Sequence, residues 1–296
     1  MGGRRLRIEK KPIKIANDII KLLDIVCADN RYPVNVKEIA LGYSRDRFPE
    51  HFIKDIKGDN LPNFEGALYG DRKGEKSRWI ILYNDQILEK RINFTLAHEF
   101  GHYMLHRDEK NSFQCLTDAI NRMTDEAERE AEANSFASQL LMPPHDFREQ
   151  IKNNEFSFDL VNHITNRYNV SLTAAILQWV KLTNKRAVMV VSKDAYIVWS
   201  YSSTSAYKDN LFIKTIGVRP VAIPEASYAF QRKTTVGNNR ADVKLPKGVW
   251  FKENVREFTI FSNQYDLTIS LLVFEDMIPS LQSEAQELDT YEKMVF

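Results

Sequence analysis

The chain has 296 residues, of which 43% are hydrophobic and 27% are charged, a composition typical of globular proteins. This excludes a wholly disordered or collagen-like chain, and the length predicts about two domains. The 41 lysines and arginines balance 40 aspartates and glutamates, so net charge neither indicates nor excludes nucleic-acid binding. Because no apolar run approaches the roughly 18 residues of a membrane span and no signal peptide is recognisable, we expect a cytoplasmic protein without a membrane partner.

Helices and strands alternate in the first part of the chain. Residues 15–28 carry apolar side chains three and four positions apart, which predicts an amphipathic helix, and a second short helix is expected at 36–41. Residues 66–69 and 78–83 are apolar and aromatic runs on either side of a polar, glycine-containing segment. They predict two short strands joined by a turn.

Two long helices are expected next. Residues 91–105 are apolar at helical intervals and free of proline, which predicts a mostly buried helix. A polar, irregular link is expected over 107–123. Residues 125–141 then form a second helix, with acidic residues in its first turns where the helix dipole favours them, and Pro143 and Pro144 end it.

The remainder of the chain begins with two further helices, expected at 156–168 and 171–182, whose short connection resembles a helix-turn-helix. A DNA-reading helix needs basic or amide side chains, but the second helix offers only Gln178 and Lys181. A packing or interdomain role is therefore favoured over DNA binding. Beyond Lys185 we expect a domain boundary and then strands at 187–191, 196–201, 257–261 and 267–274.

The segment most informative about chemistry is the HExxH pattern of residues 98–102. His98 and His102 lie one helical turn apart, so both imidazoles can reach one metal ion. Catalytic zinc takes three protein ligands and leaves one position open for water, and Glu99 is placed to act as general base. Burying these polar groups in an apolar helix would otherwise be costly, which favours a metal site over a structural histidine pair.

A catalytic site of this kind needs a third protein ligand, and the sequence offers several. His106 continues the spacing of four, but it lies a further turn along the helix, where ligation together with His98 would strain the geometry. An aspartate in the link 107–123 is a second option. The acidic helix is a third.

The acidic helix supplies four candidate glutamates, although a charged helix face is commonly just solvated: Glu126, Glu128, Glu130 and Glu132. Glu130 lies close to the expected buried face, and Asn134 one turn later is placed to orient its carboxylate. Spacing alone does not separate Glu130 from Glu126.

The sequence RINFTLAHEFGH at 91–102, followed by EREAEANSFASQLLMP at 128–143, resembles the ImmA/IrrE family of bacterial and phage metallopeptidases. The resemblance is specific over about residues 60–145, which in that family form a minimal, gluzincin-like zinc peptidase core. It implies that His98 and His102 are metal ligands, that Glu99 is the catalytic glutamate, and that Glu130 is the third ligand. Tyr103 and His106 are near enough in sequence to donate to the oxyanion, although Tyr103 equally fits a packing role.

The longer IrrE-type architecture implies an α+β fold with three parts. These are a mostly helical zinc metallopeptidase domain with a small sheet at 1–150, a helix-turn-helix-like segment at 151–185, and a C-terminal α/β GAF-like domain at 186–296. The last part is expected to sense a signal or to bind a partner.

The function that the resemblance implies is metal-dependent cleavage of a helix-turn-helix transcriptional repressor, which switches gene expression in response to stress or mobile-element signals. A small molecule or a nucleic acid can carry such a signal. The alternative is a metal-containing regulator that binds protein or DNA without proteolysis, but a structural metal site has no need of Glu99. Zinc is the expected ion, and manganese or iron also suits two histidines and a glutamate.

Overall fold

The computed structural model describes residues 11–27, 31–62, 64–73, 76–116, 124–152, 154–231, 239–262 and 266–275. The chain divides into two compact units, Met1–Trp179 and Val180–Phe296. Both helices and sheets occur among the described residues, which confirms the expected α+β class. None of the helices in these ranges is long and apolar enough to cross a membrane.

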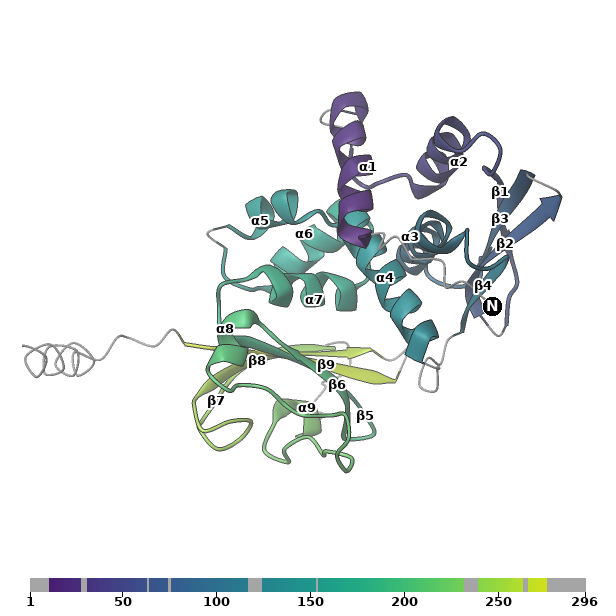
Figure 1. Cartoon of the computed structure of the whole chain (residues 1–296). Helices are drawn as coiled ribbons and strands as arrows, with labels where there is room; N and C mark the ends of the chain where they lie inside the picture. The colour runs from purple at the N-terminus through teal and green to yellow at the C-terminus, as the bar shows by residue number, and fades with distance from the viewer. Residues whose placement is uncertain are drawn as a thin grey trace, which may run out of the picture. The chain divides into compact units, whose positions relative to one another are not determined.

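The first unit contains a four-stranded mixed sheet in the order β1-β3-β2-β4 (Figure 1). β1 (Ile53–Asp59) is parallel to β3 (Lys76–Asn84), whereas β2 (Phe64–Lys73) is antiparallel to both β3 and β4 (Ser112–Leu116). Alternate residues of β3 are buried, Trp79 and Ile81 among them, so one face of the strand packs on the core.

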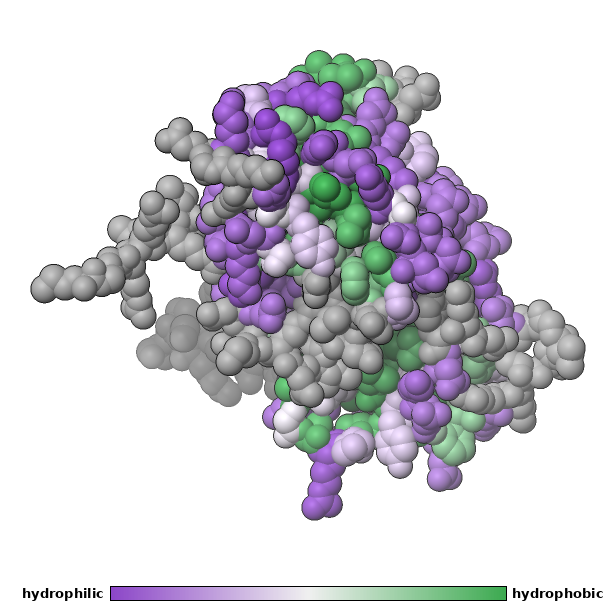
Figure 2. Space-filling view, turned by 90° about the vertical axis from the view of Figure 1, so that its right-hand side faces the viewer, coloured by the Kyte–Doolittle hydropathy of each residue, from purple (hydrophilic) through white to green (hydrophobic). Residues whose placement is uncertain are grey.

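The sheet's other face is less buried. Figure 2 looks onto the side of the molecule where β1 to β4 lie in Figure 1, and on it hydrophobic residues show between hydrophilic ones. In β3 the intervening residues, such as Ile80, are only half-buried. The sheet therefore supports the core from one side, as is common for antiparallel and mixed sheets at a protein surface.

Two long helices, α3 (Glu89–His106) and α4 (Thr124–Leu141), pack against each other, and α3 also packs on β2 and β3. A Cβ added at Gly101 of α3 would lie 3.2 Å from both the Cα and the carbonyl oxygen of Ala133 in α4. The missing side chain thus allows the two backbones to approach closely. This crossing brings the histidines of α3 near the acidic turns of α4.

Among the described residues, five further helices belong wholly or partly to the first unit. α1 (Pro12–Cys27) packs on α4 and α2 (Val36–Arg47) on β1 and α3, and the others are α5 (Pro144–Ile151), α6 (Phe158–Tyr168) and α7 (Leu172–Leu182), which crosses the unit boundary. Asn169 adopts a left-handed conformation (φ 50°) between α6 and α7. Gln178 of α7 is buried and donates a hydrogen bond to the Met142 carbonyl (3.0 Å), so it does not present its amide to solvent.

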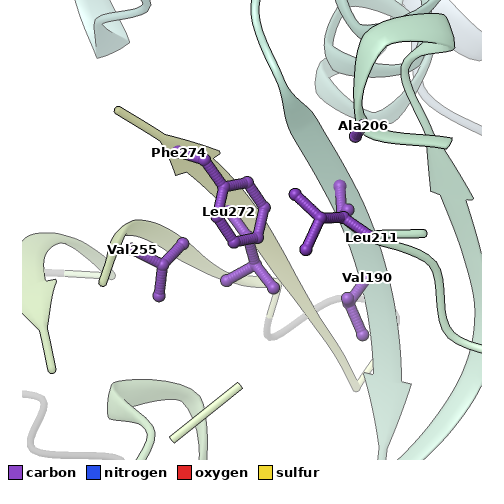
Figure 3. Close-up of a cluster of buried hydrophobic side chains, with 7 residues drawn as sticks. Val190, Ala206, Leu211, Val255, Leu272 and Phe274 are labelled. Atoms are coloured by element: carbon purple, nitrogen blue, oxygen red, sulfur yellow. The ribbon is translucent and has the colours of Figure 1, made fainter. Parts of the chain in front are cut away.

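The second unit contains a five-stranded antiparallel sheet in the order β6-β5-β9-β8-β7. Its elements are β5 (Ala187–Lys193), β6 (Tyr196–Ser202), α8 (Thr204–Lys208), α9 (Tyr228–Gln231), β7 (Arg240–Leu245), β8 (Val255–Ser262) and β9 (Leu267–Phe274). Figure 3 shows its hydrophobic core, in which Val190, Leu272 and Phe274 of the sheet meet Ala206 and Leu211. The GAF-like assignment of this unit stays a prediction.

The structure adds elements that the sequence pattern did not predict. Among the described residues these are β1, β4, α5, α8, α9 and β7. β4 corrects the expectation of an irregular link over 107–123, because residues 112–116 pair with β2, while 117–123 lie outside the described residues. β4 has only five residues, too few to show a clear alternation of apolar and polar side chains.

Candidate metal centre

The two histidines of the HExxH segment point to the same place. They lie in the continuously buried stretch of α3 from Thr95 to His106, and one helical turn separates them. Their Nε2 atoms are 3.0 Å apart, and both imidazoles are buried. The Nδ1 atoms, on the opposite side of each ring, make separate hydrogen bonds.

Glu130 of α4 completes a group of three side chains of types that ligate metals. Its Oε2 lies 3.2 Å from His98 Nε2, and its Oε1 lies 3.4 Å from His102 Nε2. One potential ligand atom from each residue lies within 4.8 Å of the others. Two imidazoles and a carboxylate are a donor set that zinc accepts, so the residues present fit a divalent ion.

The other candidates for the third ligand lie elsewhere. Glu126 is exposed and forms an ion pair with Lys110 (3.7 Å). Glu132 accepts a hydrogen bond from His106, with 2.8 Å between Oε2 and Nε2. The packing of α4 on α3 thus places Glu130, and not Glu126, beside the two histidines.

The three residues shift one another's pKa values. Burial alone would raise the pKa of Glu130, but hydrogen bonds with His102 and His98 outweigh it and hold the pKa well below its usual value. Burial lowers the pKa of His102 to about 4. Burial also opposes a charge on His98, but Glu130 and the charge of Glu99 raise the pKa of His98 above its usual value. An ionised carboxylate beside a positive charge is thus the preferred state.

Glu99 is fully buried beside this group, at a place where β2 comes unusually close to α3. A Cβ added at Gly66 of β2 would lie 2.8 Å from Glu99 Oε1 and 2.5 Å from Thr95 Cγ2. The glycine therefore leaves room for the Glu99 carboxyl group between strand and helix.

The remaining predicted residues have distinct positions. Asn134 Oδ1 lies 2.9 Å from His98 Nδ1, so Asn134 contacts a histidine of the group, whereas the sequence suggested that it would orient Glu130. His106 Nδ1 lies 3.1 Å from His102 Nδ1. Tyr103 turns elsewhere, because its hydroxyl donates to the His51 carbonyl (2.9 Å) and its ring packs edge-on against Trp79 (6.0 Å between centroids).

Two contacts of the site were not predicted from the sequence. The ring of Phe113 in β4 stacks on His102, with 4.8 Å between centroids and 15° between planes, but no strand was expected there. Gly66 was predicted to lie in a strand, but no contact with the site was predicted for it. A glycine inside an otherwise apolar strand often marks a place where the backbone comes close to another group, and this could have indicated the contact.

The comparisons with known proteins agree with this geometry. Residues 58–179 match the sequence profile of the IrrE N-terminal-like domain, Peptidase_M78. No curated protein sequence matches the chain. A transcriptional regulator from Mycobacterium tuberculosis has a similar structure, with a TM-score of 0.51 and 13% sequence identity over 90% of this chain and 82% of that chain, which supports the fold alone.

The matched segment contains β2, β3, α3 and α4, and with them His98, His102 and Glu130 as well as Glu99. The described site and the profile thus point to the same part of the chain. Residues 58–179 are thus similar to the IrrE N-terminal-like domain of Peptidase_M78, in agreement with the resemblance seen in the HExxH and acidic helices.

Proposed function

We propose that the protein is a metal-dependent endopeptidase. The observation that carries this proposal is the convergence of His98, His102 and Glu130 on one point beside the buried Glu99. Three protein ligands with a glutamate next to them are typical of catalytic zinc sites, whereas structural zinc sites commonly use four ligands, often cysteines. The Peptidase_M78 match of residues 58–179 supports the same reading.

In this proposal His98 and His102 hold the ion from α3, and Glu130 holds it from α4. The ion, for which zinc is our first choice and manganese or iron a second, supplies Lewis-acid activation of water and of the scissile carbonyl. Glu99 accepts a proton from the attacking water at its carboxylate and passes it to the leaving amine. Its carboxyl group occupies the space that Gly66 leaves open.

The substrate that we propose is a helix-turn-helix transcriptional repressor, cleaved in the cytoplasm in response to stress or to a mobile element. Support comes from the resemblance to the ImmA/IrrE family and from the IrrE N-terminal-like match. The structurally similar Mycobacterium tuberculosis protein is a transcriptional regulator, which fits a role in gene control. In this scheme the second unit receives the signal, a small molecule or a nucleic acid.

The test uses the full chain loaded with zinc or manganese and a helix-turn-helix regulator encoded beside its gene. Intact-mass measurement should show discrete fragments with the wild type and none with Glu99→Gln, which keeps the size of the side chain but removes the base. Equal metal content in both proteins is the control. Absence of fragments with fully loaded wild type, with and without candidate signals, would instead favour a regulator that acts by binding.

A further inference from the structure

Glu132 is two residues beyond the proposed ligand Glu130 and is connected to the site by a chain of hydrogen bonds. Its Oε2 lies 2.8 Å from His106 Nε2, and His106 Nδ1 lies 3.1 Å from His102 Nδ1. His102 Nε2 in turn faces Glu130 and His98. A carboxylate, two imidazoles and the proposed metal position therefore form one continuous series.

The directions of these hydrogen bonds follow from the chemistry of imidazole. For His102 to bind a metal through Nε2, its proton must sit on Nδ1, and His106 Nδ1 must then be the acceptor. A neutral His106 that accepts at Nδ1 carries its proton on Nε2 and donates it to Glu132. Each group along the series thus fixes the proton position of the next.

For a neutral His106, the opposite arrangement is unfavourable because of Glu132. If His106 donated from Nδ1 to His102, its Nε2 lone pair would face the carboxylate of Glu132 at 2.8 Å. The proton of His102 would then sit on Nε2, where it blocks metal binding. The position of one carboxylate therefore selects the proton arrangement that leaves His102 able to bind.

Burial makes this selection effective. The side chain of His106 is 1% exposed and that of Glu132 is 23% exposed, so water has little access to the series. The ring of His106 also lies 5.8 Å from that of Phe113, which limits its reorientation. Glu132 is thus set apart from an ordinary solvated glutamate such as Glu126, whose side chain is 52% exposed.

We propose that Glu132 and His106 are positioning residues that hold His102 in the Nδ1-protonated form and thereby strengthen metal binding. The inference deepens the proposed function, on whose metal site it rests. In this proposal the Nδ1 atoms of the two histidine ligands have hydrogen-bond partners of different kinds. A neutral amide, Asn134, contacts His98, whereas a carboxylate acts on His102 through a second imidazole.

Zinc affinity, measured on the full chain by competition with a chromophoric chelator, tests the proposal. His106→Leu removes both hydrogen bonds and should weaken zinc binding by about 10- to 100-fold, the range found for lost partners of metal-binding histidines. His106→Asn should recover part of the affinity, because its Oδ1 takes the place of Nδ1 and accepts the proton of His102. His106→Gln places its amide near the former Nε2 and should not recover it.

Glu132 is tested with a matched control. Glu132→Gln keeps an acceptor for His106 but loses the charge, so it should weaken zinc binding less than His106→Leu does. Glu126→Gln makes the same change on the same helix at an exposed ion pair with Lys110 and should leave zinc binding unchanged. Equal affinities of Glu132→Gln and Glu126→Gln, or of His106→Leu and wild type, would overturn the proposal. If His106→Leu does not fold, the two glutamate variants decide.

A spectroscopic measurement reads the proton positions directly. In the zinc-loaded protein labelled with ¹⁵N-histidine, long-range ¹H–¹⁵N correlation should show His106 protonated at Nε2 and unprotonated at Nδ1. A His106 protonated at Nδ1 would contradict the proposed series. Neither readout depends on peptide cleavage. An inactive protein with the expected zinc affinities would therefore contradict the proposed function and leave this inference standing. An active protein whose zinc affinity is unchanged by His106→Leu would contradict this inference and leave the proposed function standing.

Discussion

At the scale of single residues, the position of Glu99 depends on a residue without a side chain. Gly66 in β2 lies directly against the Glu99 carboxyl group and against Thr95, one turn earlier in α3. Both contacts fall below 3.0 Å for an added Cβ, a distance that real methyl groups do not tolerate. A single methyl group therefore competes with the proposed general base for the same space.

We predict that Gly66→Ala lowers peptidase activity at least tenfold while zinc affinity changes little. The added methyl group displaces the Glu99 carboxylate, and a misplaced base loses a large part of a contribution that is typically 10²- to 10⁴-fold. The three heavy atoms nearest to the added Cβ belong to Thr95 and Glu99, and none of them belongs to the histidines or to Glu130. Cleavage rates and chelator competition, measured on the same preparations, check this.

Gly42→Ala is the control for that substitution. Gly42 lies inside α2, and a Cβ there would meet nothing within 4 Å. Alanine should therefore raise stability by up to about 1 kcal/mol through helix propensity and leave cleavage unchanged. Wild-type activity in Gly66→Ala would show that Glu99 either tolerates displacement or is not the base.

The residues that could be predicted from the sequence are those related by local spacing. His98, Glu99 and His102 belong to one helical turn, so their common surroundings follow from the geometry of a helix. The position of Glu130 depends on the packing of a second helix against α3. Sequence spacing alone did not distinguish Glu130 from Glu126 as the third ligand. The interaction of Glu132 with His106 also depends on that packing, and the sequence offered Glu132 only as an alternative ligand.

At the scale of helices and strands, α5 and α6 are connected by a charged contact. Asp146 of α5 accepts hydrogen bonds from Arg167 Nη2 (2.6 Å) and from the Tyr168 hydroxyl (2.5 Å), both at the end of α6. Burial alone would raise the pKa of Asp146, but these hydrogen bonds lower the pKa below its usual value of 3.8. The folded protein therefore binds a proton at Asp146 less readily than the unfolded chain does.

The stability that Asp146 contributes should depend on pH with a defined sign. Because the folded-state pKa is the lower one, the contribution is complete above pH 3.8, the usual value, and is lost as the pH falls through the folded-state pKa. Asp146→Asn should lower the free energy of unfolding by about 2 kcal/mol at pH 7, a typical value for hydrogen bonds to a charged group. Urea unfolding followed by circular dichroism at a series of pH values measures the difference.

The difference between wild type and Asp146→Asn should shrink below about pH 4, where the unfolded wild-type chain takes up a proton at Asp146 before the folded protein does. Glu149→Gln is the control on the same helix, since Glu149 is 66% exposed and pairs only loosely with Lys152 (3.6 Å). It should change stability little at any pH. A difference for Asp146→Asn that stays constant from pH 7 to the acid range would contradict the account.

Secondary structure could be predicted where a segment is long or strongly periodic. The segments 91–105 and 125–141 were predicted and correspond to α3 and α4, which differ from them by at most two residues at each end. β1 was missed because its residues IKDIKGD are mostly polar, and its place in the sheet comes from parallel pairing with β3. Pairing partners distant in sequence leave no periodic signal in the strand itself.

At the scale of the whole molecule, each of the two units has its own buried core. The second unit also buries a carboxylate, Glu257 of β8, which is fully inaccessible to solvent. Five groups donate hydrogen bonds of 3.0–3.2 Å to it: the backbone N–H of Tyr228 and Ala229, the indole of Trp250, and the hydroxyls of Thr259 and Ser270. The carboxylate thereby attaches α9 and the segment around Trp250 to the sheet.

Glu257→Leu should destabilise the second unit by about 3 kcal/mol or more, because it leaves several buried donors without an acceptor. Glu257→Gln keeps one acceptor oxygen and should have a smaller effect. Zinc affinity should stay at the wild-type value in both variants, since the proposed ligands belong to the first unit. Thermal unfolding and zinc titration together check this, and a loss of zinc binding at temperatures where the variant is still folded would be inconsistent with it.

The sequence predicted only part of the organisation of the second unit. The sheet-rich composition after Lys185 was recognisable, and four of the five strands of the second sheet were expected. β7 was missed, since its residues RADVKL are largely polar and its position comes from pairing with β8.

The most direct test of the central claim is the metal content of purified wild type, Glu130→Ala and Glu126→Ala after dialysis against metal-free buffer. Wild type and Glu126→Ala should each retain about one ion per chain, as a site with three protein ligands does, and both should remain active. Glu130→Ala should lose the ion and the activity. Full metal content and activity in Glu130→Ala would contradict the site described here and the peptidase mechanism built on it.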